Sequence, residues 1–177
     1  LAARGYDLIL VARSEDKLNK LAAKAETAFN IKCTVIVADL SQSKAAHNLF
    51  QRVHELSLDV NFLVNNAGLL KNGFFTELSL EEQEKMIAVN VIALTSLTHL
   101  FANYMASKDG GYILNVASLA GWMAIPNQNV YAATKAYVLA FTQALANEMI
   151  VADSGVKITA LCPGYTATKM MDNQDQG

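Results

Sequence analysis

A serine, a tyrosine and a lysine in the second half of the chain have residue types and a spacing suited to proton transfer. Ser118 follows an apolar run, and Tyr131-x-x-x-Lys135 comes shortly after it. Residues four apart on a helix share one face, so Tyr131 and Lys135 would lie side by side. A fixed cation favours phenolate over phenol, which suits a proton donor or acceptor. Alone, this spacing more often reflects a packed tyrosine and a solvated lysine, so the surrounding sequence must decide.

The elements that must position these residues are short apolar runs alternating with longer helical patterns. Strands are expected at 8–12, 33–38, 60–64, 112–116 and 156–161, and helices at about 14–29, 41–56, 79–105 and 130–152. Strands that are apolar on both faces and separated by single helices predict a parallel sheet covered on both sides. The predicted fold class is α/β, a three-layer doubly wound parallel sheet, with residues 1–177 in one domain.

Local signals indicate where helices begin and end. Ser14 is expected to cap the first long helix, and Ser79 with Glu82 has the capping-box pattern. Gly5 is typical of a helix C-cap, so a helix is already ending there. Because the opposite end trails into polar residues after Met170, we expect the chain to be an internal piece of a longer protein.

Composition excludes several classes of function. The chain is 53% hydrophobic with a net charge of −2, which suits a large core and gives no reason to expect nucleic acid or an anionic membrane as partner. Its uninterrupted apolar runs are too short to span a bilayer and no signal peptide is visible, so a cytoplasmic protein is expected. Cys33 and Cys162 lie in apolar runs and are expected to be buried thiols. His47, His54 and His99 are scattered without neighbouring acids, so no metal site is predicted.

In parallel sheets, ligands bind beyond the carboxyl ends of the strands, so the residues there matter most. They are, in order, Arg13, Asp39-Leu40, Asn65-Asn66-Ala67-Gly68, Ser118 and Pro163-Gly164. Each has a structural explanation, as a surface charge, a helix N-terminal acid, turn residues or a strand-end hydroxyl. Their occurrence together in this order favours a ligand site.

The set Asn65-Asn66-Ala67-Gly68, Asn90, Ser118, Tyr131-x-x-x-Lys135 and Pro163-Gly164 resembles the short-chain dehydrogenase/reductase family in its single-domain form. The resemblance runs from Leu1 to about Met170 and includes the spacing from Ser118 to Tyr131. Extended sugar-nucleotide epimerases share Tyr-x-x-x-Lys but usually lack Asn-Asn-Ala-Gly. The resemblance implies a Rossmann-like domain that transfers a hydride between a nicotinamide and a carbonyl or secondary alcohol.

The resemblance also implies a role for each catalytic position. Tyr131 would be the general acid/base, and Lys135 would favour its phenolate form and hydrogen-bond the nicotinamide ribose. Ser118 would orient the substrate oxygen as charge develops on it. Asn90 would help hold a water that relays protons from Lys135 to solvent; without the resemblance it would be a satisfied core amide.

Cofactor contacts follow from the same resemblance. The implied residues are Arg13, Asp39, Leu40, Asn66, Ala67, Gly68, Tyr131, Lys135, Pro163, Gly164, Thr166 and Thr168. Asp39 would contact the adenine edge, and a side chain at Gly68 would crowd the cofactor. Thr168 would contact the carboxamide or a phosphate. Family members often have an apolar residue at Thr166, which leaves a side-chain contact there open.

Charge at the end of the first strand predicts the choice of cofactor. NAD-specific members usually have an acid there that binds the ribose 2′-hydroxyl. This strand instead ends in Arg13, and a guanidinium recognises phosphate with charge-assisted hydrogen bonds. We therefore predict that NADP(H) is preferred over NAD(H).

The glycine-rich turn that holds the pyrophosphate in the family does not occur in these 177 residues. In the family its strand lies in the middle of the sheet. We therefore expect a gap between the strand at 8–12 and the strand at 60–64. We also expect the 177-residue chain alone neither to fold stably nor to bind cofactor.

Substrate and assembly are less determined. The segment 121–126 is largely apolar and favours a hydrophobic ketone, aldehyde or secondary alcohol over a charged sugar as substrate. Tyr165 could form a further wall of the substrate site. Trp122 and Met123 could equally pack under a lid. The family commonly pairs the two long helices between subunits, so a homodimer or homotetramer is expected. The alternative function is a non-catalytic NADP-binding or scaffold protein that retains the fold.

Overall fold

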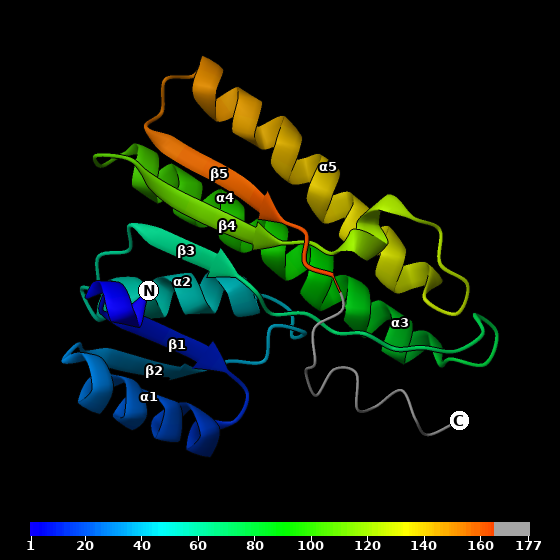
Figure 1. Ribbon diagram of the computed structural model, residues 1–177, viewed down its shortest axis with the longest axis horizontal. Coiled ribbons are helices and arrows are strands. Elements are labelled where there is room, and N and C mark those ends of the chain that lie inside the picture. The colour runs from blue at the N-terminus through cyan, green and yellow to red at the C-terminus, as the bar shows by residue number, and fades with distance from the viewer. Residues whose placement is uncertain (165–177) are drawn as a thin grey trace. The chain divides into compact units, whose positions relative to one another are not determined.

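The computed structural model describes residues 1–164, so the expectations for Thr166 and Thr168 fall outside the described residues. The chain forms two compact units, one of Leu1–Ala45 and one that begins at Ala46. Parallel strands alternate with helices in both, as the α/β prediction requires (Figure 1).

The first unit is a two-stranded parallel sheet with one helix. Strands β1 (Leu8–Ala12) and β2 (Cys33–Val37) pair in register from Leu8 opposite Cys33 to Ala12 opposite Val37. Helix α1 (Glu15–Phe29) packs on them through three residues of one face, Leu18, Ala22 and Ala25. Ser14 occupies the N-cap position, but its side chain makes no capping hydrogen bond.

Gly5 confirms the expected helix end. It follows a 3₁₀ turn, Ala2–Arg4, and has a φ of 79°, a left-handed conformation that glycine adopts without steric cost.

The second unit contains a three-stranded parallel sheet in the order β3 (Phe62–Asn65), β4 (Gly111–Val116), β5 (Val156–Leu161). Its helices are α2 (Ala45–Glu55), α3 (Leu80–Ile87), α4 (Leu94–Ala106) and α5 (Asn129–Val151). Figure 1 shows α4 and α5 running alongside β4 and β5, and both helices contact this sheet. Because β4 has a partner on each side, it carries the most buried strand residues of this sheet.

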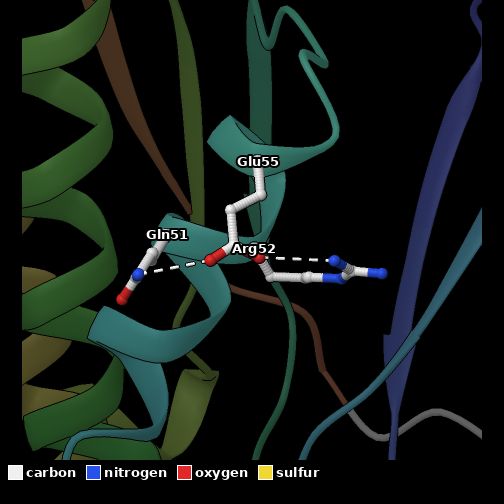
Figure 2. Close-up of polar contacts among 3 residues, drawn as sticks. All are labelled: Gln51, Arg52 and Glu55. Atoms are coloured by element: carbon white, nitrogen blue, oxygen red, sulfur yellow. Dashed lines mark hydrogen bonds and ion pairs between the residues drawn. The ribbon is translucent and has the colours of Figure 1, made fainter.

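Helix α2 begins later than predicted. The sequence pattern placed its start at Ser41, but Lys44 has a φ of 62°, and this left-handed residue interrupts the helix before Ala45. At the other end, the Glu55 carboxylate accepts hydrogen bonds from Gln51 Nε2 at 3.2 Å and Arg52 Nη1 at 3.3 Å (Figure 2). Both charged side chains are about half exposed, so the pair contributes little to stability.

The long helix expected at 79–105 is not one regular helix. Ser79 does cap it, with its Oγ accepting from the Glu82 backbone N–H at 3.2 Å. However, a π-helical segment, Ala88–Ala93, separates α3 from α4 and contains Asn90. Such wide turns inside α-helices often occur at functional sites.

The run Leu80–Ala106 is also long and apolar enough to cross a membrane by length and composition, as the core helix of a soluble protein can be. Half of its apolar 18-residue stretch is buried inside the structure.

Burial in the strands is lower than the two-sided pattern predicted. Val37 is 50% exposed and Val64 39% exposed, and both cysteines are partly rather than fully buried. β1 and β3 share no ladder and belong to separate sheets, and the gap expected between them stays a prediction. Of the five strands described, only β4 has a partner on both sides, so apolar residues on the other strands keep part of their surface.

Candidate active site

Ser118 lies just beyond β4 and begins a 3₁₀ turn, Leu119–Trp122. Its Oγ accepts a hydrogen bond from the Ala120 N–H at 3.1 Å, which fixes the side chain at the N-cap. The Leu119 N–H donates to the Pro163 carbonyl at 3.0 Å, so the ends of β4 and β5 are joined here. Within the described residues the Ser118 hydroxyl hydrogen is not donated, and it remains available to an oxygen on a ligand.

Tyr131 and Lys135 lie on the buried face of α5, with only 9% and 5% of their surfaces exposed. The Lys135 Nζ donates to the Val116 carbonyl at 2.8 Å and lies 5.8 Å from the centroid of the Tyr131 ring. Burial removes water from the ammonium and lowers the pKa of Lys135 from 10.5 to about 8. The pairing of a phenol with a lysine, inferred from their spacing, is therefore present in the fold.

Two glycines allow backbone segments to approach Lys135. A Cβ on Gly121 would lie 2.8 Å from the carbonyl carbon and oxygen of Lys135, so the turn after Ser118 is packed directly on α5. A Cβ on Gly68 would lie 3.6 Å from the Lys135 Nζ and 3.5 Å from the Asn90 Oδ1, which is ordinary contact. Gly68 therefore lies beside the ammonium, and the expectation that a side chain there would crowd the cofactor stays a prediction. Gly121 could not be singled out beforehand for this contact, because the contact depends on which helix passes beside the turn.

Asn90 joins the loop after β3 to α5. Its Oδ1 accepts from the Leu69 N–H at 2.8 Å, while its Nδ2 donates to the Leu69 carbonyl at 2.9 Å and to the Thr134 Oγ1 at 3.0 Å. The Thr134 hydroxyl in turn donates to the Tyr131 carbonyl at 2.7 Å. The side-chain amide therefore holds protein atoms in place, and the water contact expected for Asn90 stays a prediction.

A second buried polar group lies under this edge of the sheet, and the sequence analysis did not identify it. It consists of Asn65 on β3, Thr98 on α4, Asn115 on β4 and Thr142 on α5, all at least nine-tenths buried. The Asn65 Nδ2 donates to the Asn115 Oδ1 at 2.9 Å, and the Asn115 Nδ2 donates to the Thr142 Oγ1 at 3.1 Å. Asn65 and Asn115 lie opposite each other in the pairing of β3 with β4, and an asparagine in each of two apolar runs was the available signal.

The first unit contributes the residues expected at the adenine end. Arg13 is exposed beyond β1, and Asp39 and Leu40 are half-buried beyond β2. The Asp39 carboxylate accepts from the Ser41 N–H at 3.0 Å and from the Ser41 hydroxyl at 2.8 Å. These hydrogen bonds, and then the charge of Arg13, hold the pKa of Asp39 below its usual value.

The second unit brings most of the remaining predicted residues to one edge. Lys135 has Tyr131, Gly68 and the end of β4 around it, and Ser118 is tied to Pro163. Asn66, Ala67 and Gly164 are exposed. The arrangement offers a hydroxyl donor, a phenol and a buried cation at the carboxyl ends of parallel strands, where ligands bind.

The second unit therefore combines a parallel α/β sheet with a hydroxyl, a phenol and a buried ammonium at the carboxyl edge of that sheet. The model of the short-chain dehydrogenase family matches residues 1–177, and the chain belongs to that family, whose members are NAD(P)-dependent oxidoreductases acting on alcohol and carbonyl groups.

Several relatives support this assignment. An uncharacterized oxidoreductase of Staphylococcus epidermidis is 30% identical over 177 residues, all of this chain and 74% of that protein. The 7beta-hydroxysteroid dehydrogenase of Collinsella aerofaciens is 33% identical, over 95% of this chain and 62% of that protein. A short-chain dehydrogenase from Sphingobium yanoikuyae solved with NADPH has a TM-score of 0.89 and 32% identity, over 97% of this chain and 66% of that one. The chain therefore spans about two thirds of the length of these relatives.

Proposed function

We propose that the protein transfers a hydride between NADP(H) and a carbonyl or secondary alcohol on an apolar substrate. The observation that carries this proposal is the buried Lys135 ammonium, fixed to the Val116 carbonyl beside the Tyr131 ring. A lysine placed there at the cost of desolvation is explained by a nearby negative charge that forms during the reaction.

Each residue of the site then has a task. Tyr131 gives a proton to the substrate oxygen during reduction and takes one during oxidation. The positive charge of Lys135 stabilises the Tyr131 oxygen when it is without its proton. Ser118, whose Oγ is held by the Ala120 N–H, donates its hydrogen to the same substrate oxygen as negative charge develops on it.

The residues present fit a bound dinucleotide. Within the described residues, Lys135 uses one of its three N–H donors, so two remain for ribose hydroxyls. Gly68 beside it leaves the space that a side chain would fill. When bound, the nicotinamide supplies or accepts the hydride.

The decisive test is Tyr131→Phe in the full-length protein, which removes the phenolic hydroxyl and keeps the ring. The rate of hydride transfer, measured from NADPH absorbance, is expected to fall at least 10³-fold, because among the described residues no other group is placed to give the proton to the substrate oxygen. NADPH binding measured by fluorescence should stay within a few-fold. Tyr137→Phe, an exposed tyrosine on the same helix, is the matched control and should retain activity. Full activity of Tyr131→Phe would mean that another group gives the proton to the substrate. No turnover of the wild-type protein on any carbonyl would favour the non-catalytic alternative.

Arg13 supports the preference for NADP(H). It is exposed at the end of β1, and Asp39 is close enough for the two charges to interact. A ribose 2′-phosphate would be attracted by the guanidinium. We expect Arg13→Ala to weaken NADPH binding about 10- to 100-fold and to leave NADH binding within a few-fold, a loss of roughly 1.5–3 kcal/mol. An unchanged ratio of dissociation constants refutes the preference.

Two exposed residues next to the site support an apolar substrate. Trp122 and Met123 are 63% and 56% exposed in the turn that begins at Ser118. The relative from Collinsella aerofaciens is named for a hydroxysteroid, which is a large apolar alcohol. Turnover of bulky apolar ketones should exceed that of sugar ketones, and Trp122→Ala should raise KM for the apolar series.

Assembly into a homodimer or homotetramer through α4 and α5 belongs to the same proposal. Tyr137, Ile150 and Val151 are exposed apolar residues on α5. Light scattering of the full-length protein measures its mass in solution, and a monomeric mass would exclude this part of the proposal.

A further inference from the structure

We propose that the buried hydrogen bond between Asn115 and Thr142 is a positioning contact that sets where α5 lies along β4, and so places Tyr131 and Lys135 relative to Ser118. This inference rests on the proposed function. It concerns residues that touch neither the reacting atoms nor the ammonium.

Thr142 and Asn115 belong to a connected set of buried side chains. The Asn115 Oδ1 accepts from the Asn65 Nδ2 at 2.9 Å and from the Thr98 Oγ1 at 3.3 Å. The Asn115 Nδ2 donates to the Thr142 Oγ1 at 3.1 Å, and the Thr142 hydroxyl donates to the Val138 carbonyl at 2.6 Å. Asn115 is therefore held from β3 and α4 on one side of its amide, and it holds α5 with the other.

Helix α5 is attached to adjacent residues of β4 at two points. The Lys135 Nζ reaches the Val116 carbonyl, and Thr142 accepts from the side chain of Asn115. Lys135 and Thr142 are seven residues apart, so they share a helix face and are separated by about 10 Å along the axis. Val138, which is fully buried, lies between them.

The two attachments differ in what they can fix. A lysine side chain has several rotatable bonds, so its Nζ could reach the Val116 carbonyl from a range of helix positions. The Thr142 hydroxyl sits one bond from Cβ and reaches Asn115 from few positions. Apolar contacts such as those of Val138 are not directional and tolerate sliding. Of the two polar attachments, the short contact of Thr142 therefore restricts the position of α5 along β4 more than that of Lys135 does.

The strand side of the contact is equally defined. Asn115 precedes Val116, which accepts from Lys135, and it lies close to Ser118 in the chain. A shift of α5 against Asn115 therefore moves Tyr131 relative to Ser118. Buried polar groups are costly when left unpaired, which makes the paired position strongly preferred over shifted ones.

The test is Thr142→Val in the full-length protein, which keeps the shape and removes the hydroxyl. We expect kcat to fall roughly tenfold, since misplacement of reacting groups by 1 Å can cost 10²-fold. KM for NADPH should change much less than kcat, because most of the proposed cofactor contacts lie outside α5. Thr142→Ser restores the hydroxyl and should recover at least half of the wild-type kcat.

Ile113→Val, a substitution in the core on the same strand, is the control for lost stability alone. All variants are assayed well below their melting temperatures. The inference is overturned if Thr142→Val keeps the wild-type kcat. It is also overturned if Thr142→Ser and Ile113→Val lose as much kcat as Thr142→Val does. If Thr142→Val does not fold, Thr98→Val removes a different hydrogen bond to Asn115 and is judged by the same criterion. Turnover by Tyr131→Phe would instead refute the proposed function, so the two failures are distinguishable.

Discussion

Gly121→Ala adds a single methyl group where the turn after Ser118 meets α5. The new Cβ would lie 2.8 Å from both the carbonyl carbon and the carbonyl oxygen of Lys135, and 3.1 Å from the Ala136 nitrogen. All three are backbone atoms of a helix, so no side chain can rotate away to make room. Either the turn or the helix must move.

The size of that movement follows from the contact distances. Ordinary contacts to a Cβ begin at 3.4 Å, so the two segments must separate by about 0.6 Å. Strain from overpacking is expected to cost roughly 1–3 kcal/mol of stability. Because Ser118 moves with the turn while Tyr131 and Lys135 move with α5, kcat should fall about 10- to 100-fold.

The assay measures kcat, KM for NADPH and the melting temperature of Gly121→Ala in the full-length protein. Ala133→Ser adds one atom on the exposed face of α5 between Tyr131 and Lys135 and is the matched control. We expect the control to keep kcat within twofold and Gly121→Ala to lose kcat with little change in KM for NADPH. A folded Gly121→Ala protein with wild-type kcat would show that the approach of these segments does not position the site.

Three further substitutions test other parts of the structure. The pKa of Lys135 is lowered to about 8, so between that pH and 10.5 the unfolded chain binds more protons than the folded one and stability rises with pH. In cofactor-free protein this rise should approach roughly 3 kcal/mol by denaturant titration, and Lys135→Met should abolish it; a wild-type rise in Lys135→Met would contradict the assignment. Asn90→Ala removes three hydrogen bonds in a buried position and should lower the free energy of unfolding by about 3 kcal/mol, whereas a loss under 1 kcal/mol would mean that water replaces the amide. Ser79→Ala removes the cap of α3 and should cost about 1 kcal/mol, with Ser79→Asp close to wild type in the same melts.

The strands and most helix positions could be predicted because their signals are local. The apolar runs at 8–12 and 156–161 became β1 and β5 with the predicted bounds. The start of α2 could not be predicted, because it depends on the left-handed backbone conformation of Lys44. Lysine rarely adopts that conformation, so nothing in the sequence indicates it. The π-helical segment within 79–105 was also missed, because a single wide turn leaves the apolar periodicity nearly unchanged.

The candidate site residues could be proposed from the sequence, but the contacts that hold them in place could not. Tyr131, Lys135 and Ser118 were proposed from their spacing, their place near strand ends and the family resemblance. Asn115 and Thr142 are far apart in the chain and meet only when α5 packs on β4. A polar residue in an apolar run signals a buried hydrogen bond, but the identity of the partner is a property of the tertiary fold.

Lys135 shows why this support matters more than the catalytic residue types alone. Its ammonium is buried, and among the described residues it donates to the backbone carbonyl of Val116 on β4. Gly68, in the loop after β3, lies beside the ammonium, and Gly121, in the turn after Ser118, lies against the backbone of Lys135. A charge in this position is unfavourable unless those segments keep their distances, because the Val116 carbonyl offers only partial compensation for lost water. Small changes at Gly121 or Thr142 should therefore damage turnover more than larger changes on the exposed face of α5.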